Sequence, residues 1–129
     1  MIPAKLKSGS HLRIVSPSRS MGIINSSVRK VALDRLEALG FRVSFSKHCE
    51  LQDRFDSSPV QERVEDLHAA FLDPDVDGIL TTIGGYNSVE ILESLDFDLI
   101  AANPKCFCGY SDITVLGNAI FSQTGLVNY

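Results

Sequence analysis

Three short turns rich in serine and glycine are the places where this sequence could do chemistry. They span residues 16–18, 84–88 and 109–112, and each follows an apolar run of the kind that forms a buried strand. In open α/β sheets, ligands bind beyond the carboxyl ends of the strands. We therefore expect all three turns to fall at the ligand-binding end of a sheet.

The turn at residues 109–114 reads Gly-Tyr-Ser-Asp-Ile-Thr. A serine on a sharp strand-to-helix turn keeps its hydroxyl outside the sheet, and the N–H groups of the following helix start carry partial positive charge. Ser111 is therefore a candidate nucleophile for a carbonyl group, with oxyanion stabilisation beside it. The common hydrolase motif has a second glycine where this chain has Ile113. The alternative that Ser111 or Asp112 merely caps the helix thus stays open.

Gly84 and Gly85 end the preceding apolar run. Glycine allows close backbone approach, and free N–H groups at such a corner could bind an oxyanion, a carboxylate or a phosphate. The alternative is an ordinary turn that needs unusual backbone angles. The sequence contains neither a Walker motif nor a full dinucleotide fingerprint, and we predict no cofactor.

A serine nucleophile also needs a base, and none of the three histidines is a convincing one. His11 precedes the first strand, at the wrong end of the sheet. His68 is expected mid-helix and facing solvent. His48 follows a strand, but nothing in the sequence orients it. The acidic residues nearby are expected on a solvated loop and helix face. They are Asp53, Asp56, Glu62, Glu65 and Asp66.

Strand and helix patterns alternate along the whole chain. Strands are predicted at residues 12–15, 41–45, 78–83 and 104–108, with another beginning at 126–129. Helices are predicted at residues 28–39, 59–71, 88–95 and 112–124. Ser58 with Gln61, and Asn87 with Glu90, are predicted to cap two of them. The alternation implies parallel strands with right-handed crossovers. We expect one α/β domain over residues 1–129: a three-layer sandwich with a mostly parallel, flavodoxin-like sheet.

Composition excludes several classes of function. The chain has 129 residues, is 44% hydrophobic and has a formal net charge of -4, which argues against binding to nucleic acid or anionic membranes. It has no apolar run near the roughly 18 residues that cross a bilayer, and no secretory signal. Three cysteines without framework spacing fit reduced thiols in the cytoplasm. Cys106 and Cys108 lack further ligands nearby, so no metal site is predicted.

Two motifs together resemble a known family. Residues 81–88, Thr-Thr-Ile-Gly-Gly-Tyr-Asn-Ser, resemble the glycine-turn motif of the LD-carboxypeptidase family. Pro104-Lys105 followed by residues 109–114 resembles its nucleophile motif, and residues 63–78 look like the helix and strand before the glycine turn. The match is closer to the microcin C self-immunity branch. The peptidoglycan-recycling branch usually has Arg where this chain has Ile83, which favours an aminoacyl or peptidyl nucleotide amide as substrate.

The resemblance implies that Ser111 is the nucleophile of a Ser-Glu-His triad that needs no metal. The Asp112 N–H and one N–H from Gly84-Gly85 would form the oxyanion hole. The Glu and His would come from a carboxy-terminal domain that this chain lacks, so the chain would be inactive alone. Its expected partners are that domain, a small peptide or aminoacyl-nucleotide substrate, and a second copy of the chain, because uncovered apolar surface promotes self-association. A non-catalytic module that binds a small anion or a nucleotide is the alternative function.

Overall fold

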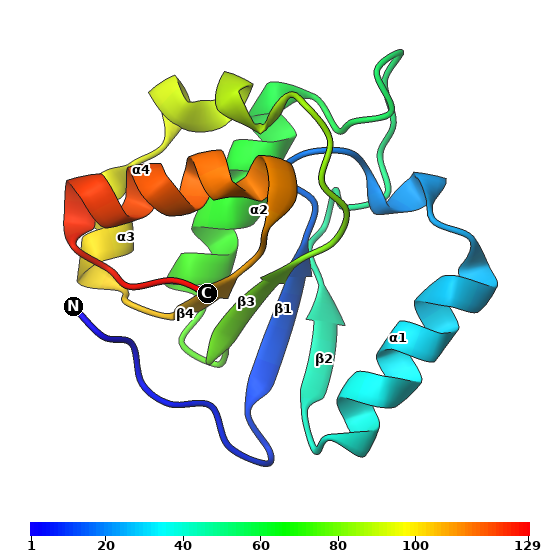
Figure 1. Ribbon diagram of the computed structural model, residues 1–129, viewed down its shortest axis with the longest axis horizontal. Coiled ribbons are helices and arrows are strands. Elements are labelled where there is room, and N and C mark those ends of the chain that lie inside the picture. The colour runs from blue at the N-terminus through cyan, green and yellow to red at the C-terminus, as the bar shows by residue number, and fades with distance from the viewer.

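The computed structural model describes all residues from Met1 to Tyr129. Four parallel strands form one sheet in the order β2-β1-β3-β4 (Figure 1). The strands are β1 (His11–Val15), β2 (Arg42–Phe45), β3 (Gly78–Thr81) and β4 (Cys106–Cys108). This is the parallel, flavodoxin-like order that the alternation predicts, so the predicted fold class is confirmed.

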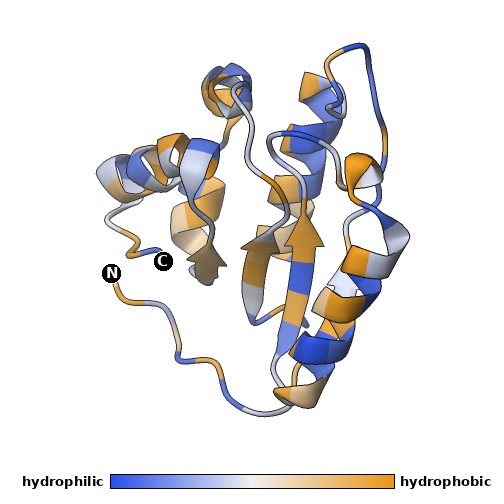
Figure 2. Cartoon of the chain, turned by 45° about the vertical axis from the view of Figure 1, so that its right-hand side comes forward, coloured by the Kyte–Doolittle hydropathy of each residue, from blue (hydrophilic) through white to orange (hydrophobic).

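Helices cover both faces of the sheet (Figures 1 and 2). Helix α1 lies on one face, and α2, α3 and α4 lie on the other, so three layers form. The α-helices are α1 (Ser26–Ala38), α2 (Val60–Leu72), α3 (Phe97–Ala102) and α4 (Thr114–Thr124). Three short 3-10 helices are η1 (Met21–Ile23), η2 (Ser88–Ser94) and η3 (Ser111–Ile113).

The main hydrophobic core lies between the sheet and helices α2 to α4. Val15, Ile79 and Phe107 point from three strands into this layer, because successive side chains of a strand face opposite sides of the sheet. The Phe107 ring stacks on Phe71 of α2 with ring centroids 6.3 Å apart, and both rings are buried. This core fixes β1, β3 and β4 relative to α2, and these elements carry the three turns.

The opposite face is thinly covered. No residue of α1 is fully buried. Val28 and Val31 are exposed, although their spacing predicts a buried stripe, and hydrophobic residues of α1 appear orange in Figure 2. The helix stands off the sheet over an apolar hollow of about 220 Å³ lined by residues such as Leu36 and Leu80. The predicted helix is present, but its apolar residues are not packed tightly against the sheet.

Both predicted helix caps are wrong. Ser58 donates to the carbonyl oxygen of His48 (2.5 Å), and α2 begins without a side-chain cap. The Asn87 side chain turns inward and donates to Ser57 Oγ (2.7 Å) instead of capping η2. In each case the side chain bonds to a residue outside the helix instead of to the backbone N–H groups at the start of the helix. The expected helix at residues 88–95 is the 3-10 helix η2, and the helix expected at 112–124 divides into η3 and α4.

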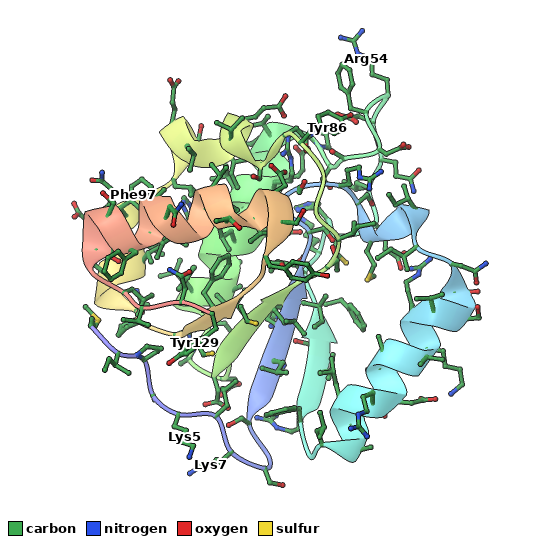
Figure 3. All side chains as sticks on the ribbon, viewed as in Figure 1. Lys5, Lys7, Arg54, Tyr86, Phe97 and Tyr129 are labelled. Atoms are coloured by element: carbon green, nitrogen blue, oxygen red, sulfur yellow. The ribbon has the colours of Figure 1, made fainter.

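Residues 126–129 do not form a strand, although Tyr129 begins to pair with β4. The Tyr129 N–H donates to the carbonyl of Phe107 (2.9 Å), and the Gly109 N–H donates to the carbonyl of Tyr129 (2.8 Å). Figure 3 shows Tyr129 beside β4. These two bonds have the parallel pattern expected of a neighbouring strand.

We predict that Phe107→Ala lowers the free energy of unfolding of the chain by about 3–5 kcal/mol, because it removes a buried ring and leaves a cavity against Phe71. Urea denaturation followed by circular dichroism measures this change. Phe121→Ala is the matched control: Phe121 is exposed on α4, so its loss should change stability by less than about 0.5 kcal/mol. Equal effects of the two substitutions would contradict the assignment of the core.

Candidate active site

The turns after β1, β3 and β4 meet at the carboxyl end of the sheet. Ser18 Oγ, in the turn after β1, donates to Asp112 Oδ2 after β4 (2.6 Å). The Ser88 N–H, after β3, donates to the same oxygen (2.9 Å). Because β1, β3 and β4 are adjacent in the sheet, three segments far apart in sequence form one site.

Ser111 occupies a strained corner. Its φ is 62°, in the left-handed region that residues other than glycine rarely adopt. Such backbone strain costs on the order of 1–3 kcal/mol and is typical of functional sites. Ser111 is exposed, and neither η3 nor α4 has a side-chain cap at its start. The hydroxyl is therefore free, and the alternative that Ser111 caps the helix is excluded.

Gly84 lies directly beside this hydroxyl. A Cβ atom added at Gly84 would sit 3.0 Å from Ser111 Oγ and 3.5 Å from the Asp112 backbone nitrogen. A Cβ atom at Gly85 would sit 2.6 Å from Ser18 Oγ. Neither glycine has a positive φ, so the interpretation as a turn that needs unusual angles is wrong. Close approach is what requires glycine here, and it leaves open space next to the hydroxyl.

Free backbone donors complete the corner. Among the hydrogen bonds of the chain, none is donated by the N–H groups of Gly84, Gly85 or Asp112. Unpaired N–H groups beside an exposed hydroxyl are what an oxyanion site needs. The roles of these residues in catalysis remain predictions.

The Asp112 carboxylate holds the corner together. Besides the two bonds to its Oδ2, its backbone carbonyl accepts from Ser88 Oγ (2.7 Å). Partial burial would raise the pKa of Asp112, but the hydrogen bonds from Ser18 and Ser88 outweigh it, and the pKa lies below its usual range. Asp112 therefore links turns and does not cap its own helix.

Behind this corner lies Arg63 of α2, which sequence reasoning found only as part of the family resemblance. Its side chain is 1% exposed. It donates to the carbonyls of Pro17 (3.2 Å) and Asn87 (3.0 Å) and to Glu90 Oε2 (2.6 Å). The sequence carries one sign that Arg63 is buried: it lies three residues after Val60 and so falls on the apolar stripe of its helix.

No histidine of the chain bonds to Ser111. His11 lies at the amino end of the sheet, as expected, with Nε2 2.6 Å from Ser44 Oγ. His48 is oriented after all, because its Nδ1 lies 2.9 Å from Asp66 Oδ1. Asp66 is itself buried, so its prediction as a solvated residue is wrong.

His68 also differs from the prediction. It is half-buried, and its Nε2 accepts a hydrogen bond from the Asp96 N–H (2.9 Å). Burial lowers the pKa of His68, although the nearby Asp96 charge partly opposes this shift. All three histidines are thus engaged away from Ser111.

The rim beside Gly85 is aromatic. Tyr86 is 62% exposed, and its hydroxyl donates to the Phe55 carbonyl (3.3 Å) (Figure 3). No group of three or more His, Cys, Asp or Glu side chains is arranged to hold a metal ion. No helix has the length and apolar character needed to span a bilayer.

Comparison with known proteins identifies the family of the chain. The family model described as the LD-carboxypeptidase N-terminal domain matches residues 12–129. The putative carboxypeptidase YocD of Bacillus subtilis is 51% identical to this chain over all 129 residues, and the match covers 40% of YocD.

Solved structures give the same match. An MccF-like protein from Bacillus anthracis is 57% identical, with a TM-score of 0.98 over 99% of this chain and 39% of its own. The microcin C7 self-immunity protein MccF in complex with aspartyl sulfamoyl adenosine is 32% identical, with a TM-score of 0.94 over 99% of this chain and 38% of its own. A muramoyltetrapeptide carboxypeptidase from Oxalobacter formigenes is 28% identical, with a TM-score of 0.74 over 88% of this chain and 37% of its own.

The chain thus spans about two fifths of the length of the relatives it matches. The model match covers both the glycine turn and the serine turn, and the whole sheet superposes on theirs. By these matches the chain belongs to the LD-carboxypeptidase family and corresponds to the amino-terminal domain of its members.

Proposed function

We propose that residues 1–129 form the amino-terminal, nucleophile-bearing domain of a two-domain serine hydrolase. The complete protein would cleave an amide or peptide bond next to a terminal carboxyl group or a nucleotide moiety, and this domain would be inactive alone. The observation that carries the proposal is the exposed Ser111 hydroxyl, held at a positive φ beside Gly84 and unpaired N–H groups.

The reaction follows from this arrangement. Ser111 Oγ attacks the carbonyl carbon, an O–C bond forms, and the hydroxyl proton passes to a base. The Asp112 N–H and an N–H of Gly84 or Gly85 bind the oxyanion. Collapse of the tetrahedral intermediate breaks the C–N bond, and the leaving amine takes the proton from the base. Water then attacks the acyl carbon while the same base takes its proton; the C–Oγ bond breaks, the carboxylic acid leaves, and the base returns the proton to Ser111 Oγ.

The base must come from outside these residues. All three histidines are engaged elsewhere, and the family resemblance assigns the Glu and the His of the triad to a carboxy-terminal domain. The matched relatives are long enough to contain such a domain. We therefore propose that domain as the first partner of the chain. No cofactor or metal is part of the proposal.

Among amide substrates, we favour an aminoacyl nucleotide over a murein peptide. MccF is similar to this chain over nearly the whole length of this chain, and it was solved in complex with aspartyl sulfamoyl adenosine. The tetrapeptide carboxypeptidase structure superposes less closely. Ile83 also stands where the peptidoglycan-recycling branch usually has Arg. A small LD-peptide is the second candidate. Because the three cysteines are free thiols, we further propose a cytoplasmic location.

We predict that Ser111→Ala in the complete protein lowers kcat for an aminoacyl-sulfamoyl nucleotide by several orders of magnitude. The other two serines at this corner, Ser18 and Ser88, are buried and their hydroxyls donate to Asp112, so they cannot replace Ser111. Cleavage followed by chromatography measures the change, with an LD-peptide tested in parallel. Ser94→Ala, at an exposed serine of η2, is the matched control and should keep full activity. Undiminished cleavage by Ser111→Ala would disprove the nucleophile. Tight nucleotide binding without cleavage by either protein would favour the binding module.

We predict that Asp112→Asn destabilises the chain by about 1 kcal/mol at pH 7, because an uncharged amide oxygen accepts weaker hydrogen bonds from Ser18 and Ser88 than the carboxylate does. The pKa of Asp112 is lowered in the folded chain, so its contribution is present above the unfolded pKa of about 3.9 and is lost as pH falls through the folded pKa. The gap between wild type and variant in urea denaturation should therefore close toward pH 3. Glu93→Gln, at an exposed residue, should show no such trend. A gap that is constant with pH would contradict the role of the carboxylate.

We also propose that the isolated domain self-associates as a homodimer. Val28 and Val31 of α1 are 57% and 69% exposed, and Val28 also lines the apolar hollow between α1 and the sheet. Light scattering of the chain should give a mass near twice that of one copy, and Val31→Asp should shift it toward one copy. A monomer at high micromolar concentration would refute this expectation.

A further inference from the structure

The Arg63 guanidinium is a buried charge that reaches two turns of the active site. Burying a charge costs several kcal/mol unless hydrogen bonds compensate it. Three acceptors surround Arg63: the carbonyls of Pro17 and Asn87 and the carboxylate of Glu90. Its Nε has no partner, so even this environment leaves one donor unsatisfied. An apolar side chain at this position would avoid that cost, so stability alone does not explain Arg63.

The two carbonyls belong to different turns. Pro17 lies in the turn after β1 and Asn87 in the turn after β3, and the same nitrogen, Nη1, donates to both. Arg63 itself lies in α2, which packs on the core beneath the turns. The planar guanidinium presents its donors in fixed directions, so it sets how far apart the two turns lie.

The residues that follow the two carbonyls are the ones that bind Asp112. Ser18 follows Pro17, and its hydroxyl donates to Asp112 Oδ2. Ser88 follows Asn87, and its N–H donates to that same oxygen. Each carbonyl that accepts from Arg63 is therefore followed in the sequence by a residue that donates to the Asp112 carboxylate.

We propose that Arg63 is a positioning residue that sets the geometry of the oxyanion corner without touching substrate. By fixing the Pro17 and Asn87 carbonyls, it holds Ser18 and Ser88 at the spacing that one Asp112 carboxylate can bridge. Asp112 in turn places its own N–H and Ser111 beside Gly84. The inference rests on the proposed hydrolase function and names a residue that acts through others.

The test uses the complete protein and the aminoacyl-sulfamoyl nucleotide. Arg63→Met keeps much of the side-chain volume but removes every donor. We expect kcat to fall about 100-fold with KM within about threefold, because displacing a catalytic group by about 1 Å costs this much while the binding surface is unchanged. Arg63→Lys keeps the charge but not the planar fork, and its kcat should fall about tenfold. It also answers the question if Arg63→Met does not fold.

Glu90→Gln is the matched control. This substitution removes the charge of Glu90, whose side chain is 47% exposed. It leaves in place the hydrogen bonds from Arg63 to the carbonyls of Pro17 and Asn87. Its kcat should stay within about twofold of wild type, even if its melting temperature falls. Activities are compared well below the melting temperature of each variant, so that a loss of stability alone does not lower kcat.

The outcomes separate this inference from the proposed function. If wild type cleaves, Ser111→Ala does not, and folded Arg63→Lys and Arg63→Met keep wild-type kcat, the positioning role is wrong and the hydrolase stands. An equal loss of kcat in Glu90→Gln would also overturn it, because charge pairing would then explain the effect. If Ser111→Ala cleaves as wild type does, the proposed function itself fails.

Discussion

The carboxylate of Asp112 is the interaction on which the active-site corner depends. One oxygen accepts from Ser18 and from Ser88, and so joins three turns that no strand ladder connects. Ser111 immediately precedes it and holds a left-handed backbone angle. A strained residue persists only where its surroundings leave no alternative. Without the carboxylate, the turn could relax, and the hydroxyl would no longer face Gly84.

The strand order decides which turns can meet. Because β1 lies between β2 and β3, the turns after β1, β3 and β4 are neighbours, whereas the segment after β2 begins on the far side of β1. His48 follows β2 and is held by Asp66 of α2. Its position explains why the one histidine at the carboxyl end of the sheet does not bond to Ser111. The strand order therefore keeps His48 away from the turns that meet at Ser111.

The parallel sheet and the position of the turns could be predicted, because apolar periodicity and the crossover rule depend on local sequence. The same reasoning places Ser111, Gly84, Gly85 and Asp112 at strand ends, but the choice of a catalytic role over a helix cap or an ordinary turn came from the family resemblance and stays a prediction. The predicted caps failed because Ser58 and Asn87 bond to residues distant in sequence. Arg63 and Asp66 were hidden for a similar reason: a charged side chain is buried only where a folded partner receives it, and the sequence does not show that partner.

The uneven packing of the two faces fits the proposed arrangement in two domains, in which one domain holds the nucleophile and the other supplies the base. In the proposed hydrolase, the nucleophile and the oxyanion donors must be held within a fraction of an ångström. Ser111 and Gly84 lie at the carboxyl ends of strands that the large core holds in place, next to the hydrogen bonds of Arg63 and Asp112. A base has a smaller demand: it must come within hydrogen-bond reach of one exposed atom, Ser111 Oγ. It can therefore be supplied by a separately folded domain that docks over the rim. Rigid donors on one domain and a docking base on the other would also make the isolated half inert, because the serine cannot lose its proton until the two halves meet.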